Sequence, residues 1–127
     1  MTECVAALTI VPLAEINAHL RKPSNDTFLK WFTAREHAYC RPKRYPAEHY
    51  ASRLAAKKAC FKVLGLAVDP AQFSRIEIVR LPGGRPVLKV APRLLTSRKL
   101  RPGTRFELSM AHERDAAIAY VVMDPCV

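Results

Sequence analysis

The segment PAEHYASRLAAKKACFKVLG, residues 46–65, constrains the fold of this chain more than any other part of the sequence. It begins with Pro46, ends with Gly65, and is rich between them in alanine, leucine and lysine, which are strong helix formers. At about 100° per residue, one apolar stripe collects four large side chains: Tyr50, Leu54, Phe61 and Leu64. The segment therefore predicts a long helix that packs on the core through this stripe.

The same helix carries four cations and no acid over residues 53–65, RLAAKKACFKVLG. Arg53 and Lys57 are four residues apart, as are Lys58 and Lys62, and like charges at this spacing destabilise a helix by about a few tenths of a kcal/mol. Lys57 falls within the apolar stripe, whereas Lys58 and Lys62 lie beside small residues. We expect such a face to serve a partner that approaches the backbone closely.

Composition limits the kinds of partner. The chain has 127 residues, half of them hydrophobic, which is enough for one core, so we expect one domain over residues 1–127. Its 21 lysines and arginines against 11 acids give a net charge of +10. This balance indicates a polyanionic partner: nucleic acid, a phosphorylated small molecule or an acidic protein.

The cysteines and the N-terminal apolar run exclude several classes of protein. Cys4, Cys40, Cys60 and Cys126 show no CxxC spacing, so we expect free thiols in a reducing compartment and neither a zinc site nor a disulfide framework. The run VAALTIVPLAEI lacks a basic leader and is too short to span a bilayer. The sequence predicts a cytoplasmic protein without membrane association.

The remaining segments predict helices first and antiparallel strands second. Residues 5–11 read as a buried strand, 13–22 as a helix, and 34–40 as a helix with Thr33 and Glu36 at capping-box spacing. Residues 75–80 and 87–90 read as a hairpin around LPGGRP, followed by strands at 105–110 and 116–123. This order predicts an α+β domain with a C-terminal antiparallel sheet.

Together these segments resemble one family, the holo-acyl-carrier-protein synthases, which are small trimeric 4′-phosphopantetheinyl transferases. Four segments carry the resemblance, which is collinear over roughly residues 8–122: FTAREHAYC (32–40), HYASRLAAKKACFKVLG (49–65), IEIVRLPGGRPVL (76–88) and LSMAHERDAAIAYVV (108–122). It implies the 4′-phosphopantetheinyl transferase fold and a homotrimer with sites between subunits. It also implies transfer of phosphopantetheine from coenzyme A to a serine of an acidic carrier of fatty-acid or polyketide synthesis.

The resemblance also implies which residues form the site. Those matched to coenzyme A or phosphopantetheine binding are Lys43, Arg44, Arg53, Lys57, Lys58, Lys62, Gly84, Arg85 and Pro86. Lys43 and Arg44 match the place where the family holds the 3′-phosphate of the nucleotide, and the GRP turn matches a GKP turn near the adenine. The residues matched to catalytic positions are Glu36, Lys62, His112 and Glu113.

Three positions depart from the family pattern. Thr9 and Lys58 occupy the places of an aspartate and a glutamate that coordinate magnesium, and Glu15 replaces an arginine that holds the carrier. Because Mg²⁺ takes hard oxygen ligands, usually carboxylates, the resemblance implies no metal ligand set in this chain. The Lys58 ammonium is either a solvated charge or a replacement for the metal charge beside the pyrophosphate.

Three functions are consistent with these observations. In the first, the chain is a divergent relative, a pseudoenzyme candidate that binds coenzyme A, phosphopantetheine or a carrier protein. Standard magnesium-dependent transfer is then lost or replaced by altered chemistry on a carrier-bound substrate. In the second, it is an active 4′-phosphopantetheinyl transferase. In the third, which only the charge supports, it binds nucleic acid, without any RNP, KH or recognition-helix pattern.

Overall fold

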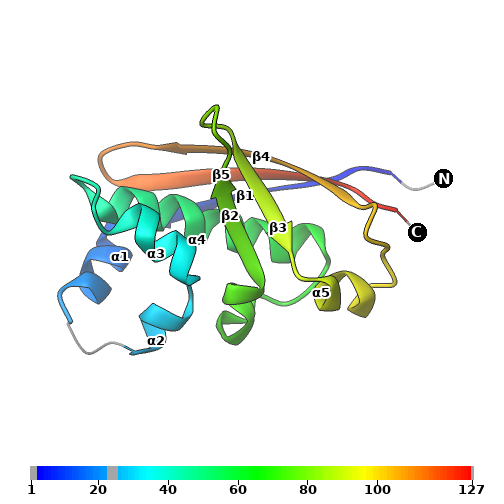
Figure 1. Cartoon of the computed structure of the whole chain (residues 1–127), viewed down its shortest axis with the longest axis horizontal. Coiled ribbons are helices and arrows are strands. Elements are labelled where there is room, and N and C mark those ends of the chain that lie inside the picture. The colour runs from blue at the N-terminus through cyan, green and yellow to red at the C-terminus, as the bar shows by residue number, and fades with distance from the viewer. Residues whose placement is uncertain (1–2, 23–25, 127) are drawn as a thin grey trace.

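The computed structural model describes residues 3–22 and 26–126 (Figure 1). In chain order its elements are β1 (Val5–Pro12), α1 (Leu13–Leu20), α2 (Asp26–Lys30), α3 (Ala34–Cys40), α4 (Pro46–Val63), η1 (Pro70–Arg75), β2 (Ile76–Arg80), β3 (Pro86–Val90), α5 (Pro92–Ser97), β4 (Arg105–His112) and β5 (Ala116–Asp124). Helices and antiparallel strands are combined as the sequence predicts, so the expected α+β class is confirmed.

The strands form two separate antiparallel sheets. β1, β5 and β4 make a three-stranded sheet in that order, in which Tyr120 lies opposite both Leu8 and Ser109. β2 and β3 form the predicted hairpin, which pairs with itself only. In Figure 1 the three long strands run along one side of α4 and the shorter helices lie on its other side.

The long helix α4 is the centre of the core. Thirteen of its 18 residues are buried, including three of the four members of the predicted apolar stripe, and the fourth, Leu64, is buried just beyond its end. Ala51, Ala55 and Ala59 are completely buried, and β5 contributes the equally buried Ala117 and Ala119 to the same core. Because α4 packs on β5, these small residues let the helix and the sheet approach closely. The sequence predicts that a partner approaches the backbone at these small residues, whereas in the structure β5 of the same chain does so.

Local signals fixed most element boundaries. The capping box predicted at Thr33 and Glu36 is present, and Gly65 follows α4 with φ of 71°, a conformation that glycine adopts without strain. The short helices α2, η1 and α5 were not predicted. β4 extends two residues further than expected, so His112 ends a strand instead of lying in a turn. Within the described ranges, no helix has both the length and the apolar character needed to cross a bilayer.

The outer face of the three-stranded sheet is apolar and exposed, so β1 is not the buried strand that the sequence predicts. Side chains alternate along β1 and β5, so that one set faces α4 and the other faces away from it. Leu8 and Ile10 of β1 are 52% and 57% exposed, and they pair with Tyr120 and Ile118 of β5, which are 45% and 37% exposed. Two adjacent strands therefore present one contiguous apolar surface, which we call the outer sheet face.

All four cysteines are free thiols, as the sequence predicts. Cys40 and Cys60 are buried, and burial raises the pKa of these thiols to about 11 and about 12, respectively. Since the thiolate is the reactive form, both side chains act as small core residues.

Candidate functional site

A cluster of cations surrounds the ring of Tyr39, which lies on α3. Lys43 Nζ is 4.3 Å from the ring centroid, Arg53 Cζ is 4.2 Å from it, and Arg80 Cζ is 5.7 Å from it. The face of an aromatic ring attracts cations, but three cations on one ring also repel one another. In residues 3–22 and 26–126, no carboxylate pairs with any of the three. We call Tyr39, Lys43, Arg53 and Arg80 the Tyr39 cluster.

Arg53 is the buried member of the Tyr39 cluster. Only 1% of this residue is exposed, and its Nη1 donates a hydrogen bond to the carbonyl of His49 at 3.2 Å. Its Nε is buried and finds no acceptor among the described residues. A buried donor without a partner costs free energy.

Arg80 joins the β2–β3 turn to the cluster. Its Nη1 donates to the carbonyl of Gly84 at 2.6 Å, and Gly84 has φ of 89°, which the tight turn requires. The predicted turn residues Gly84, Arg85 and Pro86 are thereby held next to the Tyr39 cluster. Sequence reasoning missed Arg80 and Tyr39 as site residues, although both lie within segments that carry the family resemblance.

Two histidines extend the site from the ring toward β4. The His49 ring lies 5.7 Å from the ring of Tyr39 and 5.9 Å from the ring of His112, and His112 Nδ1 is 3.4 Å from Glu48 Oε2. Burial, assisted by the charges of Arg53, His112 and Lys43, lowers the pKa of His49 and favours its neutral form. The predicted residue His112 thus lies beside His49 and Glu48, two residues that the sequence did not reveal.

Lys57 and Glu36 form a buried ion pair. Lys57 Nζ donates to Glu36 Oε1 at 2.8 Å, to the carbonyl of Phe73 at 2.8 Å and to the carbonyl of Ile76. Both side chains are 0% exposed. Burial lowers the pKa of Lys57, while the Glu36 carboxylate acts to raise it. All three ammonium donors are used within the protein.

This ion pair contradicts the ligand-binding role expected for Lys57 and the catalytic role expected for Glu36. Lys57 faces no ligand, because its donors are satisfied by α3, η1 and β2. Glu36 accepts hydrogen bonds from the backbone of Thr33 and Ile78 as well as from Lys57, and only 1% of it is exposed. Neither residue presents an atom to a substrate, and both instead hold α3, α4 and the hairpin together.

The two charge reversals predicted from the sequence face each other. Lys58 Nζ on α4 is 3.7 Å from Glu15 Oε1 on α1, and their side chains are 28% and 39% exposed. Thr9 is buried on β1, and its hydroxyl has no hydrogen-bond partner among the described residues. The ammonium at position 58 is thus neutralised by a residue of its own chain.

The residues present do not fit a magnesium ion. A lysine ammonium repels a divalent cation, and a single threonine hydroxyl is a weak ligand without carboxylates beside it. Over the described parts of the chain, no group of three or more histidine, cysteine or acidic side chains is arranged to hold a metal. The described side chains therefore offer no site for a magnesium ion that could take part in catalysis.

The other predicted residues lie on the surface of the protein. Arg44 is exposed, with its guanidinium 5.4 Å from the ring of Tyr45, and Lys62 is exposed near the end of α4. Glu113 is exposed in the β4–β5 turn, where its backbone N–H donates to the carbonyl of Ala116. These three side chains are open to solvent and available to a ligand or a partner.

Comparison with known proteins agrees with this architecture. The family model of the 4′-phosphopantetheinyl transferase superfamily matches residues 10–121. A holo-acyl-carrier-protein synthase of Geobacter sp. strain M21 is 34% identical over 117 residues, which cover 91% of this chain and 93% of the relative. The chain belongs to the holo-acyl-carrier-protein synthase family. The resemblance read from the sequence is confirmed.

Two solved structures of the family share the fold. A complex of the Chronobacterium ammoniagenes synthase with coenzyme A superimposes with a TM-score of 0.82 over 98% of both chains, at 21% identity. The synthase of Neisseria meningitidis gives a TM-score of 0.78 over 94% of this chain and 96% of its own, at 26% identity. The present chain therefore keeps the fold of the synthases.

Proposed function

We propose that this member of the holo-acyl-carrier-protein synthase family binds coenzyme A at the Tyr39 cluster without a protein-held magnesium ion. The observation that carries the proposal is the group of three cations on one ring, with no carboxylate beside them in the described structure. Coenzyme A carries three phosphate groups, which would relieve the repulsion among these cations. A related synthase has been crystallised with coenzyme A, which supports this ligand.

Each member of the site has a role in this proposal. Lys43 and Arg80 contact phosphate oxygens, and the buried guanidinium of Arg53 adds positive charge beside the Tyr39 ring. The exposed cations Arg44, Lys62 and Arg85 add longer-range attraction, which salt screens. Gly84 and Pro86 shape the turn against which the rest of the nucleotide rests. Phosphopantetheine alone would use fewer of these contacts and bind more weakly.

Standard magnesium-dependent transfer is not part of this proposal. The transfer joins a carrier serine oxygen to the phosphorus of the phosphopantetheine group and releases adenosine 3′,5′-bisphosphate. It requires charge stabilisation at the pyrophosphate and a base for the serine proton. Lys58 supplies a positive charge, but Glu15 offsets it at 3.7 Å. The protein would then act as a coenzyme A or carrier-binding partner, or perform altered chemistry on a carrier-bound substrate.

A second candidate function is an active transferase, and one observation favours it. The His112 side chain is 40% exposed and has Glu48 at 3.4 Å, so it can accept a serine proton while the carboxylate stabilises the imidazolium. Lys58 would then replace part of the metal charge, and Glu113 would lie beside the base. Nucleic-acid binding remains the least supported function, because only the net charge favours it.

We also propose that the chain forms a homotrimer through the outer sheet face. Leu8, Ile10, Ile118 and Tyr120 are exposed in a single apolar patch of the kind that marks an interface. Leu8→Glu places a charge in that patch, so we expect light scattering to detect monomers of the variant and trimers of the parent. A monomeric parent protein would refute this proposal.

The test of function combines binding with transfer. The protein is incubated with coenzyme A, magnesium and apo-carrier proteins, and the carrier mass is measured, while calorimetry measures coenzyme A binding. We expect binding without a gain of carrier mass. Clear modification of the carrier would establish the active transferase, whereas absence of coenzyme A binding would overturn both candidates.

A double variant tests whether the absence of two carboxylates is what prevents magnesium-dependent transfer. Thr9→Asp with Lys58→Glu restores two carboxylates at the matched positions while leaving Glu15 in place. Magnesium-dependent transfer by this variant alone would show that missing ligands limit the reaction. If transfer appears only when Glu15→Arg is added, carrier docking or the local charge balance is limiting as well.

A further inference from the structure

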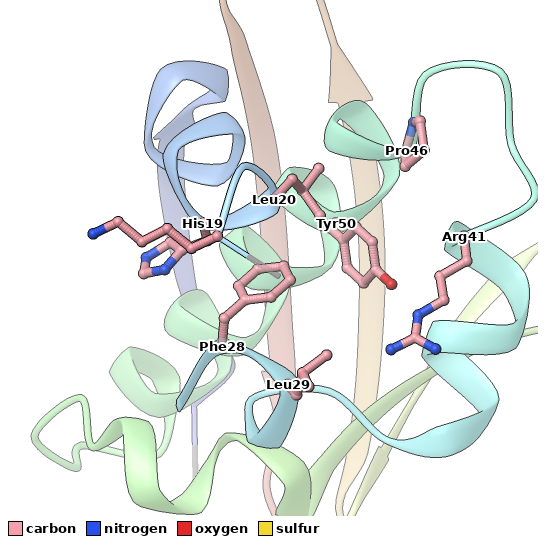
Figure 2. A pocket seen from close by; sticks show the side chains of 8 residues that line it. His19, Leu20, Phe28, Leu29, Arg41, Pro46 and Tyr50 are labelled. Atoms are coloured by element: carbon pink, nitrogen blue, oxygen red, sulfur yellow. The ribbon is translucent and has the colours of Figure 1, made fainter. Parts of the chain in front are cut away.

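A cavity of about 320 Å³ opens between α1, α2, the end of α3 and the start of α4 (Figure 2). Its lining shares no residue with the Tyr39 cluster and consists of His19, Leu20, Lys22, Phe28, Leu29, Arg41, Pro46 and Tyr50. This volume lies within the range of small-molecule sites in proteins. The cavity has no role in coenzyme A binding as proposed above, so a ligand for it must be of a different kind.

The floor of the cavity is aromatic and its rim is aliphatic. Phe28 and Tyr50 are 3% and 1% exposed, and their rings meet edge to face with centroids 5.3 Å apart. Leu20 and Leu29 are 40% and 37% exposed at the rim. Figure 2 shows these two leucines on either side of the paired rings. An apolar body of modest size would cover all four side chains.

The polar groups of the cavity are basic. His19, Lys22 and Arg41 contribute to the lining, and the described lining contains no carboxylate. Burial raises the pKa of Tyr50 while the neighbouring Arg41 guanidinium acts to lower it, so the charge of Arg41 lies near the edge of the aromatic floor. In Figure 2 the guanidinium is turned toward the space in front of Tyr50 and Leu29. An anionic group would therefore be held beside an apolar surface.

We propose that this cavity binds an amphipathic organic acid, namely a carboxylate with an aryl or medium-length alkyl body. The apolar body covers Phe28, Leu20 and Leu29, and the carboxylate pairs with Arg41, whose planar guanidinium matches a carboxylate in geometry. A nucleotide is a poor match, because most of the cavity wall is apolar. This inference does not depend on coenzyme A binding and would hold if that function were absent.

The protein contains its own reporter of this site. Trp31 is the single tryptophan, and its ring lies 4.9 Å from that of His19 and 5.9 Å from that of Phe28. Both neighbours line the cavity. A ligand that seats against them will change the surroundings of the indole, so tryptophan fluorescence measures occupancy directly.

The test titrates the full chain with octanoate while Trp31 fluorescence is recorded, with octanol as the uncharged control. We expect a saturable change with octanoate and much weaker binding of octanol. Arg41→Gln should weaken octanoate binding about tenfold, the effect of losing one charge-assisted contact. Arg21→Gln removes a neighbouring cation outside this cavity and should leave the affinity unchanged. Leu29→Asp, at an exposed rim position, should abolish binding without unfolding the chain.

Three results would overturn the proposal. Octanol could bind as tightly as octanoate, which would leave the basic side chains without a role. Arg41→Gln and Arg21→Gln could have equal effects, which would indicate attraction by net charge alone. An acidic amphipathic peptide could saturate the fluorescence change while octanoate fails to do so, which would make the cavity a protein-docking site.

Discussion

Lys58 Nζ lies 3.7 Å from a carboxylate oxygen of Glu15 and joins α4 to α1. Read from the sequence, these residues are two separate departures from the family: a lost metal ligand and a lost carrier contact. In the structure the two side chains form one ion pair. A reversal at either position alone would place two like charges together.

Exchanging the two charges tests this relationship. Lys58→Glu places a second carboxylate beside Glu15 and should lower the free energy of unfolding, whereas Glu15→Arg with Lys58→Glu should recover it. Since both side chains are partly exposed, we expect the coupling between them to be less than about 1 kcal/mol. Urea unfolding of the parent, the two single variants and the double variant measures it. Strictly additive effects would contradict the pairing.

A larger loss of stability is expected when the buried ion pair of Lys57 and Glu36 is broken. Lys57→Met leaves the Glu36 carboxylate buried without its cation and should lower the free energy of unfolding by about 3–5 kcal/mol. Lys62→Met, one turn further along α4 at an exposed position, is the matched control and should change it by less than about 0.5 kcal/mol. Similar losses of stability in the two variants would show that the fold does not depend on the charge of Lys57.

The Tyr39 cluster predicts which side chains govern coenzyme A affinity. Tyr39→Leu removes the ring that holds three cations, and Arg80→Gln removes one of them. Each should weaken binding by about 0.5–2 kcal/mol, and Tyr39→Phe should retain most of the affinity. Arg93→Gln, an exposed cation on α5, should have no effect beyond a small electrostatic change. Calorimetry at physiological ionic strength makes the comparison, and equal losses for Arg80→Gln and Arg93→Gln would refute the assignment.

His49 predicts a pH dependence of anion binding. Burial and the nearby Arg53 lower its pKa from 6.5, so that the free protein holds His49 neutral near pH 7. An anion at the cluster offsets the positive charges of Arg53 and Lys43 and raises that pKa, so binding takes up a proton. Affinity should therefore increase as the pH falls toward 6.5 and below it.

Calorimetry in two buffers of different ionisation enthalpy measures this proton uptake. His49→Gln should abolish most of it while leaving the Tyr39 cluster in place. Proton release on binding, or uptake that the variant leaves unchanged, would show that another group titrates with the ligand.

The fold was predictable because its signals are local. The Pro46 and Gly65 boundaries of α4, the capping box at Thr33 and the alternating strands each depend on residues close in sequence. The short helices α2, η1 and α5 escaped prediction, because five or six residues carry too little periodicity to separate a helical turn from a loop.

The site was less predictable because its contacts join distant segments. The charge pattern of α4 marked Arg53, Lys57 and Lys58 as similar cations, but each meets a different partner: the Tyr39 ring, the Glu36 carboxylate and the Glu15 carboxylate. The apolar stripe set Lys57 apart from Lys58, but no local signal identified the partner that each cation meets. Only the packing of α4 against α1 and α3 does so.

The central claim, coenzyme A binding at the Tyr39 cluster without protein-held magnesium, is tested most directly by one calorimetric titration of coenzyme A. It is performed in EDTA and repeated in excess magnesium. We predict saturable binding with the same affinity in both, because Thr9 and Lys58 provide no metal site. Binding that is absent in EDTA, or about tenfold tighter with magnesium, would contradict the claim.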